Sequence, residues 1–223
     1  MIVIATNNGS EFLPNLLSDL EKFNITEEIS IIDTQSNDLE FINYLFNLKL
    51  KYQLNINVYQ TPYRGFDTGA YVYAINNLKS DRFIFLQDSI KIKTKEFFDV
   101  IDEKLKLTNI VCVMSFIGNY WGNYPDSEIL KQYCEENFGS IEYDVGIYGP
   151  MFSISYSDSQ LFNKNELIYP INKLQQMAME RCWPILFKKH NLSISAVEDC
   201  QADDELLNTN GYKYIEKYRP YRL

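Results

Sequence analysis

The sequence predicts an α/β protein, a single domain in which a mostly parallel sheet is flanked by helices. Short apolar runs that end abruptly in polar residues alternate with segments whose apolar residues recur at helix spacing. Three successive strand-helix-strand units of this kind favour a parallel sheet with helices on both faces. The chain has 223 residues, of which 46% are hydrophobic and 15% aromatic, so it is long and apolar enough to fold around a sizeable core.

The first half of the chain supplies four expected strands and the helices between them. The strands are short and mostly apolar, which suits strands buried on both faces of a sheet. Their ranges are Ile2–Ala5, Ile29–Ile32, Ile56–Tyr59 and Arg82–Leu86. Ser10 and Asp38 are expected to cap the first two helices, and Phe66–Leu78 is expected to form the third.

The second half has a weaker pattern. Residues 118–149 are rich in Tyr, Trp, Gly and Asn, and we interpret them as an excursion that lines a site. The tail from residue 211 is basic and aromatic, and its stretch from Lys213 to Arg222 could meet a diphosphate or a membrane surface, although a solvated end is the default expectation. The expected helices are Lys95–Leu107, Ser127–Phe138 and Ile171–His190, the last interrupted at Pro184, and the expected strands are Ile110–Met114, Pro150–Tyr156 and Leu192–Val197.

The composition of the chain argues against several kinds of binding partner and metal site. The net charge of −9 and the lack of a Lys/Arg-rich run argue against nucleic acid as a partner. Four cysteines without a CxxC pair, and a single histidine, argue against a zinc site and favour reduced core thiols. The opening residues do not resemble a signal peptide, and no stretch approaches the roughly 20 apolar residues of a transmembrane helix. We therefore expect a cytoplasmic protein without a transmembrane segment.

Polar side chains follow the expected strands at their carboxyl ends. The first strand leads into the loop Thr6–Gly9, and the second ends at Asp33. Arg64 and Asp67 follow the third strand, and Gln87, Asp88 and Ser89 follow the fourth. Ligands of an open α/β sheet bind just beyond the carboxyl ends of its strands. The sequence therefore predicts a site at this edge, with an Arg for anions and several carboxylates.

Together these features resemble the nucleotide-sugar half of a GT-A-type glycosyltransferase. Arg64-Gly65-x-Asp67-x-Gly69-Ala70 is similar to the RGxDxG segment of rhamnan-synthesis-type enzymes. Gln87-Asp88-Ser89 falls where the family carries its DxD motif, and Asp33 falls where a carboxylate meets the nucleobase. The resemblance covers about the first 115 residues well and the rest loosely. It implies one domain over 1–223, with a nucleotide-sugar-binding half at 1–115 and an acceptor-binding half at 116–223.

The resemblance also implies roles for individual residues. Asp88 would bind Mn²⁺ or Mg²⁺, although Gln87 and Ser89 replace the second carboxylate of a DxD motif. The general base would be Glu180, which has Arg181 and Trp183 beside it, or Asp199 after a late strand. The donor would be bound by residues at the strand ends, which are Thr6, Asn8, Asp33, Arg64, Asp67, Gly69, Gln87 and Asp88.

Each of these residues also has a plain structural interpretation. Asp88 and Asp33 could be turn carboxylates, Arg64 could pair with Asp67, and a glycine such as Gly69 could serve only a turn or positive φ. Helix carboxylates such as Glu180 are mostly solvated.

The implied activity is transfer of a sugar from a nucleoside-diphosphate sugar, with UDP as the favoured nucleotide, to a hydroxyl of a glycan, lipid-linked or protein acceptor. The expected route is metal-assisted and inverting. Two alternatives stay open. A nucleotidyltransferase would use similar metal chemistry, but the loop Thr6–Glu11 lacks the basic residue usual in that class. A non-catalytic glycan- or nucleotide-binding module would explain the degenerate DxD.

Overall fold

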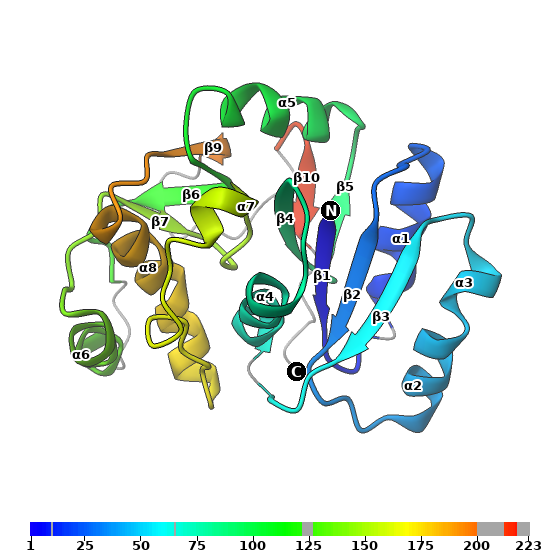
Figure 1. Ribbon diagram of the computed structural model, residues 1–223, viewed down its shortest axis with the longest axis horizontal. Helices are drawn as coiled ribbons and strands as arrows, with labels where there is room; N and C mark the ends of the chain where they lie inside the picture. The colour runs from blue at the N-terminus through cyan, green and yellow to red at the C-terminus, as the bar shows by residue number, and fades with distance from the viewer. Residues whose placement is uncertain (10, 65, 122–126, 200–211, 218–223) are drawn as a thin grey trace.

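The computed structural model describes residues 1–9, 11–64, 66–121, 127–199 and 212–217. Strands and helices alternate through the first half, as the sequence predicts (Figure 1). The strands are β1 Ile2–Thr6, β2 Ile29–Asp33, β3 Ile56–Gln60, β4 Arg82–Gln87, β5 Ile90–Ile92, β6 Ile110–Ile117, β7 Val145–Ile147, β8 Phe152–Ser155, β9 Ile194–Asp199 and β10 Ile215–Lys217. The helices are α1 Leu13–Lys22, α2 Leu39–Phe46, α3 Leu48–Lys51, α4 Phe66–Asn77, α5 Glu96–Leu105, α6 Ser127–Phe138, α7 Tyr156–Ser159 and α8 Lys173–Lys189.

One sheet of eight strands runs through both halves of the chain. Its order is β3-β2-β1-β4-β8-β6-β7, and β9 pairs with β6 outside this path. The pairs β1–β2, β2–β3, β1–β4 and β6–β9 are parallel, whereas β8 runs antiparallel to both β4 and β6. The expected α/β fold with a mostly parallel sheet flanked by helices is therefore confirmed, and β8 joins the two halves.

The strand order reverses beside β1. From β1 the chain proceeds through β2 to β3 in one direction, and β4 then returns to the other side of β1. The carboxyl ends of the four strands are in register, because Thr6 pairs with Asp33, Asp33 pairs with Gln60, and Ala5 pairs with Gln87. A reversal of this kind is the topological switch point at which open α/β sheets bind ligands.

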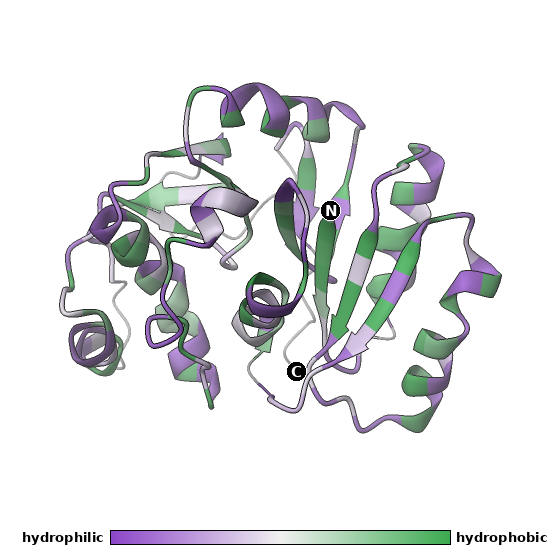
Figure 2. Ribbon diagram, in the orientation of Figure 1, coloured by the Kyte–Doolittle hydropathy of each residue, from purple (hydrophilic) through white to green (hydrophobic). Residues whose placement is uncertain are grey.

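The core follows from the apolar runs. Every residue of β1 and β2 is buried, as expected for strands covered on both faces. Figure 2 shows these central strands as mainly hydrophobic, while the helices carry hydrophilic residues on their outer sides. The helix α4 packs on β1, and at the other end of the sheet α6 packs against α8 (Figure 1). The buried thiols of Cys134 and Cys182 lie 2.9 Å apart between those two helices.

The sequence predicted helix caps and a helix break, and the structure confirms only some of them. Asp38 caps α2 by accepting hydrogen bonds from the backbone N–H groups of Glu40 and Phe41, as predicted. The predicted cap Ser10 lies outside the described residues. The predicted interruption of the long helix at Pro184 is wrong, because α8 runs without a break from Lys173 to Lys189. Its residues from 181 to 187 are all buried, and this packing outweighs the lost hydrogen bond of the proline, a cost of about 3 kcal/mol.

The tail also differs from the expectation. Ile215–Lys217 forms β10, which pairs antiparallel with β5 in a separate two-stranded sheet. Ile215 is fully buried opposite Ile92, so this part of the tail is not a solvated end. Sequence analysis missed β5 and β10 because each is only three residues long. In the described part of the chain, no helix has the length and apolar character needed to span a membrane.

Candidate active site

The site is built around Thr6 and Asp88 at the switch point between β1 and β4. The Thr6 hydroxyl donates a 2.7 Å hydrogen bond to Oδ2 of Asp88, and the Asp88 backbone N–H donates to the carbonyl of Ala5. Gly9 packs so closely that a Cβ there would lie 2.1 Å from Oδ2 of Asp88 and 2.4 Å from the Thr6 hydroxyl. A larger residue at position 9 would force the Asp88 carboxylate or the Thr6 hydroxyl to move. The two predicted strand ends are thus joined directly.

The electrostatics of Asp88 follow from this position. The pKa of Asp88 is raised to about 7, mainly because the carboxyl is buried and in smaller part because of the nearby charge of Asp67. The hydrogen bond from Thr6 and the positive charge of Lys217 act in the opposite direction. Burial likewise raises the pKa of Asp67, against the pull of Lys217 and the hydrogen bond from Gln87.

Asp67 lies at the start of α4, and its carboxylate accepts hydrogen bonds from two side-chain amides. The Nε2 groups of Gln87 and Gln176 both donate to its Oδ2. The carbonyl oxygens of both amides are buried and have no hydrogen-bond partner among the described residues. Arg64 does not pair with Asp67 there. Arg64 is exposed and its guanidinium lies 5.8 Å from the centre of the Phe66 ring, so the alternative of an Arg64–Asp67 pair is not supported.

Glu180 reaches the same cluster from α8. Its Oε1 accepts a 2.9 Å hydrogen bond from the Gly149 backbone N–H, and its Oε2 pairs with Arg181 at 3.0 Å. Arg181 is itself buried and lies over the Phe116 ring, at 4.9 Å from the ring centre, so it holds Glu180 in place. The charge of Glu180 acts on Asp67. The Glu180 side chain is 19% exposed, so it is not sealed from solvent.

The structure adds Lys217 to this group, a residue that sequence analysis did not select. Its Nζ lies 2.7 Å from the point that a Cβ on Gly149 would occupy, and Oε1 of Gln87 lies 2.8 Å from the same point. Asp67, Glu180 and Asp88 all act on its charge. The sequence marks Lys217 only as part of a basic tail, and its place in this cluster could not be predicted, because it depends on the pairing of β10 with β5.

Other predicted donor residues lie in neighbouring loops. Both carboxylate oxygens of the buried Asp33 accept hydrogen bonds, one oxygen from Ser36 and the other from Gln60. Asn8 is exposed, and its side chain links the loop after β1 to the backbone of Asn37 and Asp38. Both residues therefore shape the loops at the sheet edge. No hydrogen bond or ion pair joins either of them to the Asp88 cluster within the described ranges.

Two further predicted residues fit their roles less well. Gly69 is buried in α4 without a positive φ, and a Cβ there would only touch Tyr169 at an ordinary 3.6 Å. The interpretation of Gly69 as a glycine with positive φ is therefore wrong. Asp199 lies at the exposed end of β9 and accepts a 2.7 Å hydrogen bond from Ser115. Within the described part of the chain, no hydrogen bond or ion pair links Asp199 to the cluster.

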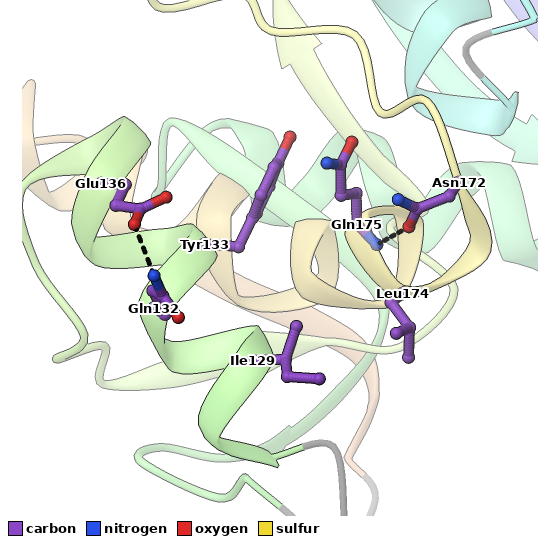
Figure 3. A pocket seen from close by; sticks show the side chains of 7 residues that line it. All are labelled: Ile129, Gln132, Tyr133, Glu136, Asn172, Leu174 and Gln175. Atoms are coloured by element: carbon purple, nitrogen blue, oxygen red, sulfur yellow. Dashed lines mark hydrogen bonds between the residues drawn. The ribbon is translucent and has the colours of Figure 1, made fainter.

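A hollow of about 190 Å³ lies elsewhere, between α6 and the start of α8 (Figure 3). None of the predicted site residues lines it. Tyr133 and Gln175 face each other across it, with Ile129 and Leu174 at one side. The hollow is separate from the strand-end cluster, because Gln176, the neighbour of Gln175 on α8, points toward Asp67 instead.

The donor set at Asp88 fits one kind of metal site only. No group of three or more His, Cys, Asp or Glu side chains is arranged around a common point in the described residues, so an all-protein cage does not form there. Hard cations in nucleotide sites often take one or two carboxylates and complete their coordination with phosphate oxygens and water. Asp88, with the adjoining Thr6 hydroxyl, fits a cation of that kind, which arrives with a diphosphate.

Comparisons with solved structures agree on the fold. The S. aureus TarS 1-349 structure with UDP aligns with a TM-score of 0.54 at 15% identity, covering 92% of this chain and 61% of that one. The same protein with UDP-GlcNAc aligns with a TM-score of 0.51 at 13% identity, covering 91% and 58%. This chain spans about three-fifths of the TarS 1-349 chains. The predicted GT-A-like fold is thus confirmed. The sequence matches no family model and no curated protein.

Proposed function

We propose that this chain is a glycosyltransferase that uses a nucleoside-diphosphate sugar, with UDP as the nucleotide, and a hydroxyl acceptor. The observation that carries the proposal is the pair formed by Thr6 and Asp88 at the switch point, with Gly9 packed against it and Glu180 in the same cluster. The TarS structures of the same fold were solved with UDP and UDP-GlcNAc, which supports this choice of donor.

In this proposal, different strand-end residues bind different parts of the nucleotide-sugar donor. Asp33, Asn8 and Arg64 belong to the loops beyond β2 and β3 and bind the nucleoside side. Thr6, Gln87 and Asp88 lie at the carboxyl ends of β1 and β4 and bind the diphosphate side. The Asp67 carboxylate accepts a hydrogen bond from Gln87, so we assign Asp67 to the diphosphate side as a positioning residue. Gly69 lies in the first turn of α4, close to Asp67 in the chain, and is kept as a donor-binding residue in this proposal.

The metal and the base complete the proposal. A divalent cation held by Asp88 and the phosphate oxygens would neutralise the charge that builds on the leaving diphosphate. Glu180 is the proposed base, because Gly149 and Arg181 orient its carboxylate in the cluster. Asp199 is the second candidate, held by Ser115 at the end of β9. The acceptor would be a glycan or another hydroxyl compound bound by residues of the 116–223 half.

The proposed reaction is a single displacement. The acceptor oxygen forms a bond to C1 of the donor sugar while the bond between C1 and the diphosphate oxygen breaks. The electron pair of that bond leaves with the diphosphate, and the acceptor proton passes to the Glu180 carboxylate. Attack from the face opposite the leaving group inverts the configuration at C1. Holding the two reactants in line, and stabilising the leaving group, lower the barrier.

The experiment that tests this function is thermal unfolding with nucleoside diphosphates and their sugars, each with Mn²⁺ or with EDTA, followed by assay of released nucleoside diphosphate. Ligand that binds the native state raises Tm. We expect UDP and a UDP-sugar to raise Tm in Mn²⁺, and Asp88→Ala to remove both the shift and the turnover. Asp144→Ala is the control, since Asp144 is 77% exposed and pairs only with Lys188 among the described residues.

Other outcomes would change the assignment. A Tm shift that survives EDTA and Asp88→Ala would keep the nucleotide site and remove Asp88 as a metal ligand. Pyrophosphate release from a nucleoside triphosphate and a sugar phosphate would favour a nucleotidyltransferase. No shift with any nucleotide would favour the non-catalytic module.

A further inference from the structure

The strand β10 brings a cation to the Asp88 cluster beyond the carboxyl end of β4. Lys217 is the last residue of β10 and pairs with Ile90, two residues beyond Asp88. Ile215 anchors the strand, because its side chain is fully buried opposite Ile92. The position of Lys217 is therefore set by strand pairing, and its side chain is half-buried rather than free in solvent.

The surroundings of the Lys217 ammonium are those of a ligand site. Its Nζ approaches the backbone of Gly149, whose φ of +63° and lack of a Cβ leave room for it. The ring of Tyr148 lies at 5.5 Å from Nζ. The buried carbonyl of Gln87 points to the same place and has no hydrogen-bond partner among the described residues. Polar groups of both signs thus converge beside Asp88.

The charges of this cluster indicate what it can bind. Asp67, Asp88 and Glu180 act on Lys217, and so does a cation, the exposed Lys173. A diphosphate carries negative charge and would be repelled by the carboxylates unless cations stand between them. One divalent cation at Asp88 offsets part of that charge. A half-buried ammonium whose charge acts on Asp88 offers a second point of attachment through N–H donors.

We propose that Lys217 binds the diphosphate of the nucleotide-sugar donor, so that β10 closes the donor site opposite Asp88. This inference rests on the proposed function. In the reaction, the ammonium would donate hydrogen bonds to the diphosphate oxygens as the C1–O bond breaks and its electron pair passes to the leaving group. No proton has to leave Lys217 in this role.

The test compares affinities of the full chain for uridine and for UDP, by calorimetry, at saturating Mn²⁺ and in EDTA. We expect Lys217→Gln to weaken UDP binding in Mn²⁺ by about tenfold or more, the usual cost of losing a hydrogen bond between charged groups. Uridine affinity should change by less than twofold, since uridine has no phosphate. Lys217→Arg should restore most of the UDP affinity. Lys213→Gln is the matched control, because Lys213 lies on the same segment, is 66% exposed and pairs with Glu96.

The outcomes separate this inference from the proposed function. If Lys217→Gln binds UDP in Mn²⁺ as the unmodified chain does, Lys217 is not a diphosphate ligand, although the nucleotide site stands. Equal losses for uridine and UDP, with a lowered Tm, would assign Lys217 a purely structural role and overturn the inference. If the unmodified chain binds neither UDP nor any other nucleoside diphosphate, both proposals are wrong.

Discussion

At the scale of single residues, Gly9 is the position where the site tolerates least change. A Cβ at this residue would overlap both the Asp88 carboxylate and the Thr6 hydroxyl. We therefore expect Gly9→Ala to break the Thr6–Asp88 hydrogen bond and to lower the free energy of unfolding by about 1–3 kcal/mol. Urea denaturation followed by circular dichroism measures this change.

Gly69→Ala is the matched control for this substitution. Its Cβ would make only an ordinary contact with Tyr169, and alanine is the better helix former, so a gain of about 0.5–1 kcal/mol is expected. If Gly9→Ala is as stable as Gly69→Ala, the close packing around Asp88 described above is wrong.

Glu166 supplies a pH-dependent contribution to stability outside the candidate site. Burial opposes its charged form, but hydrogen bonds from Lys189, the backbone N–H of Asn163 and His190 outweigh that and lower the pKa of Glu166 from 4.5 to about 2. A lowered carboxyl pKa stabilises the fold above the unfolded-state pKa, and the contribution is lost as pH falls through the folded-state value.

Glu166→Gln should therefore destabilise the chain at pH 7 by about 1–3 kcal/mol. The difference between the variant and the unmodified chain should shrink as pH falls from about 4.5 toward 2. Urea unfolding at a series of pH values measures it. The control is Glu136→Gln, since Glu136 is exposed and bonds only to Gln132 within the described residues. A difference that stays constant down to pH 2 would contradict the assigned cause.

Residue positions could be predicted from sequence where strand periodicity determines them. Asp88 and Thr6 each follow an apolar run, and parallel pairing brings such ends together, so their proximity was predictable. Lys217 lies more than 120 residues beyond Asp88 in the chain, and its place depends on a pairing that leaves no periodic signal. The engagement of Asp33 by Ser36 and Gln60 also depends on loop conformation, which the sequence does not reveal.

At the scale of elements, the strands β5 and β10 form a small unit whose stability can be tested separately. Ile215 is its buried centre on β10. Removing that side chain should weaken the pair by about 2–4 kcal/mol and make it open locally. In Ile215→Ala we therefore expect faster amide hydrogen exchange in the segment containing Ile90–Ile92.

The segment containing β2, Ile29–Asp33, is the internal control for this experiment, because it belongs to the main sheet. Its exchange should change little in Ile215→Ala. Equal acceleration in both segments would mean that β10 is an integral part of the main fold and does not open by itself. If the proposed role of Lys217 holds, UDP should slow the exchange of Ile90–Ile92 in the unmodified chain.

The helix α8 illustrates why elements resist prediction in the second half. A proline predicts a break, and the proline at position 184 does remove one backbone donor. The helix continues because Trp183 and Phe187 pack against Phe152 of β8, a contact between distant parts of the chain. In the first half, neighbouring elements pack on one another in chain order, and there the predicted strands and helices match the structure closely.

At the scale of the whole molecule, the sheet makes the two halves one structural unit. The strand β8 belongs to the second half by sequence, yet it pairs with β4 of the first half, and the buried Ser153 hydroxyl donates to the Phe83 carbonyl across that boundary. The proposed division at residue 115 would then be functional only. Both tryptophans, Trp121 and Trp183, lie in the second half, so tryptophan fluorescence reports on that half alone.

This arrangement predicts that a destabilising substitution in the core of the first half lowers the stability of the second half by the same amount. Leu17 of α1 is fully buried in the first half, and Leu17→Ala should lower the free energy of unfolding by about 2–5 kcal/mol. Because the sheet is continuous, tryptophan fluorescence and far-UV circular dichroism should give the same urea midpoint, shifted by the same amount. Leu39→Ala, at a residue that is 74% exposed, should shift neither. If circular dichroism shifts while the fluorescence midpoint stays in place, the halves unfold independently and the chain contains two folding units.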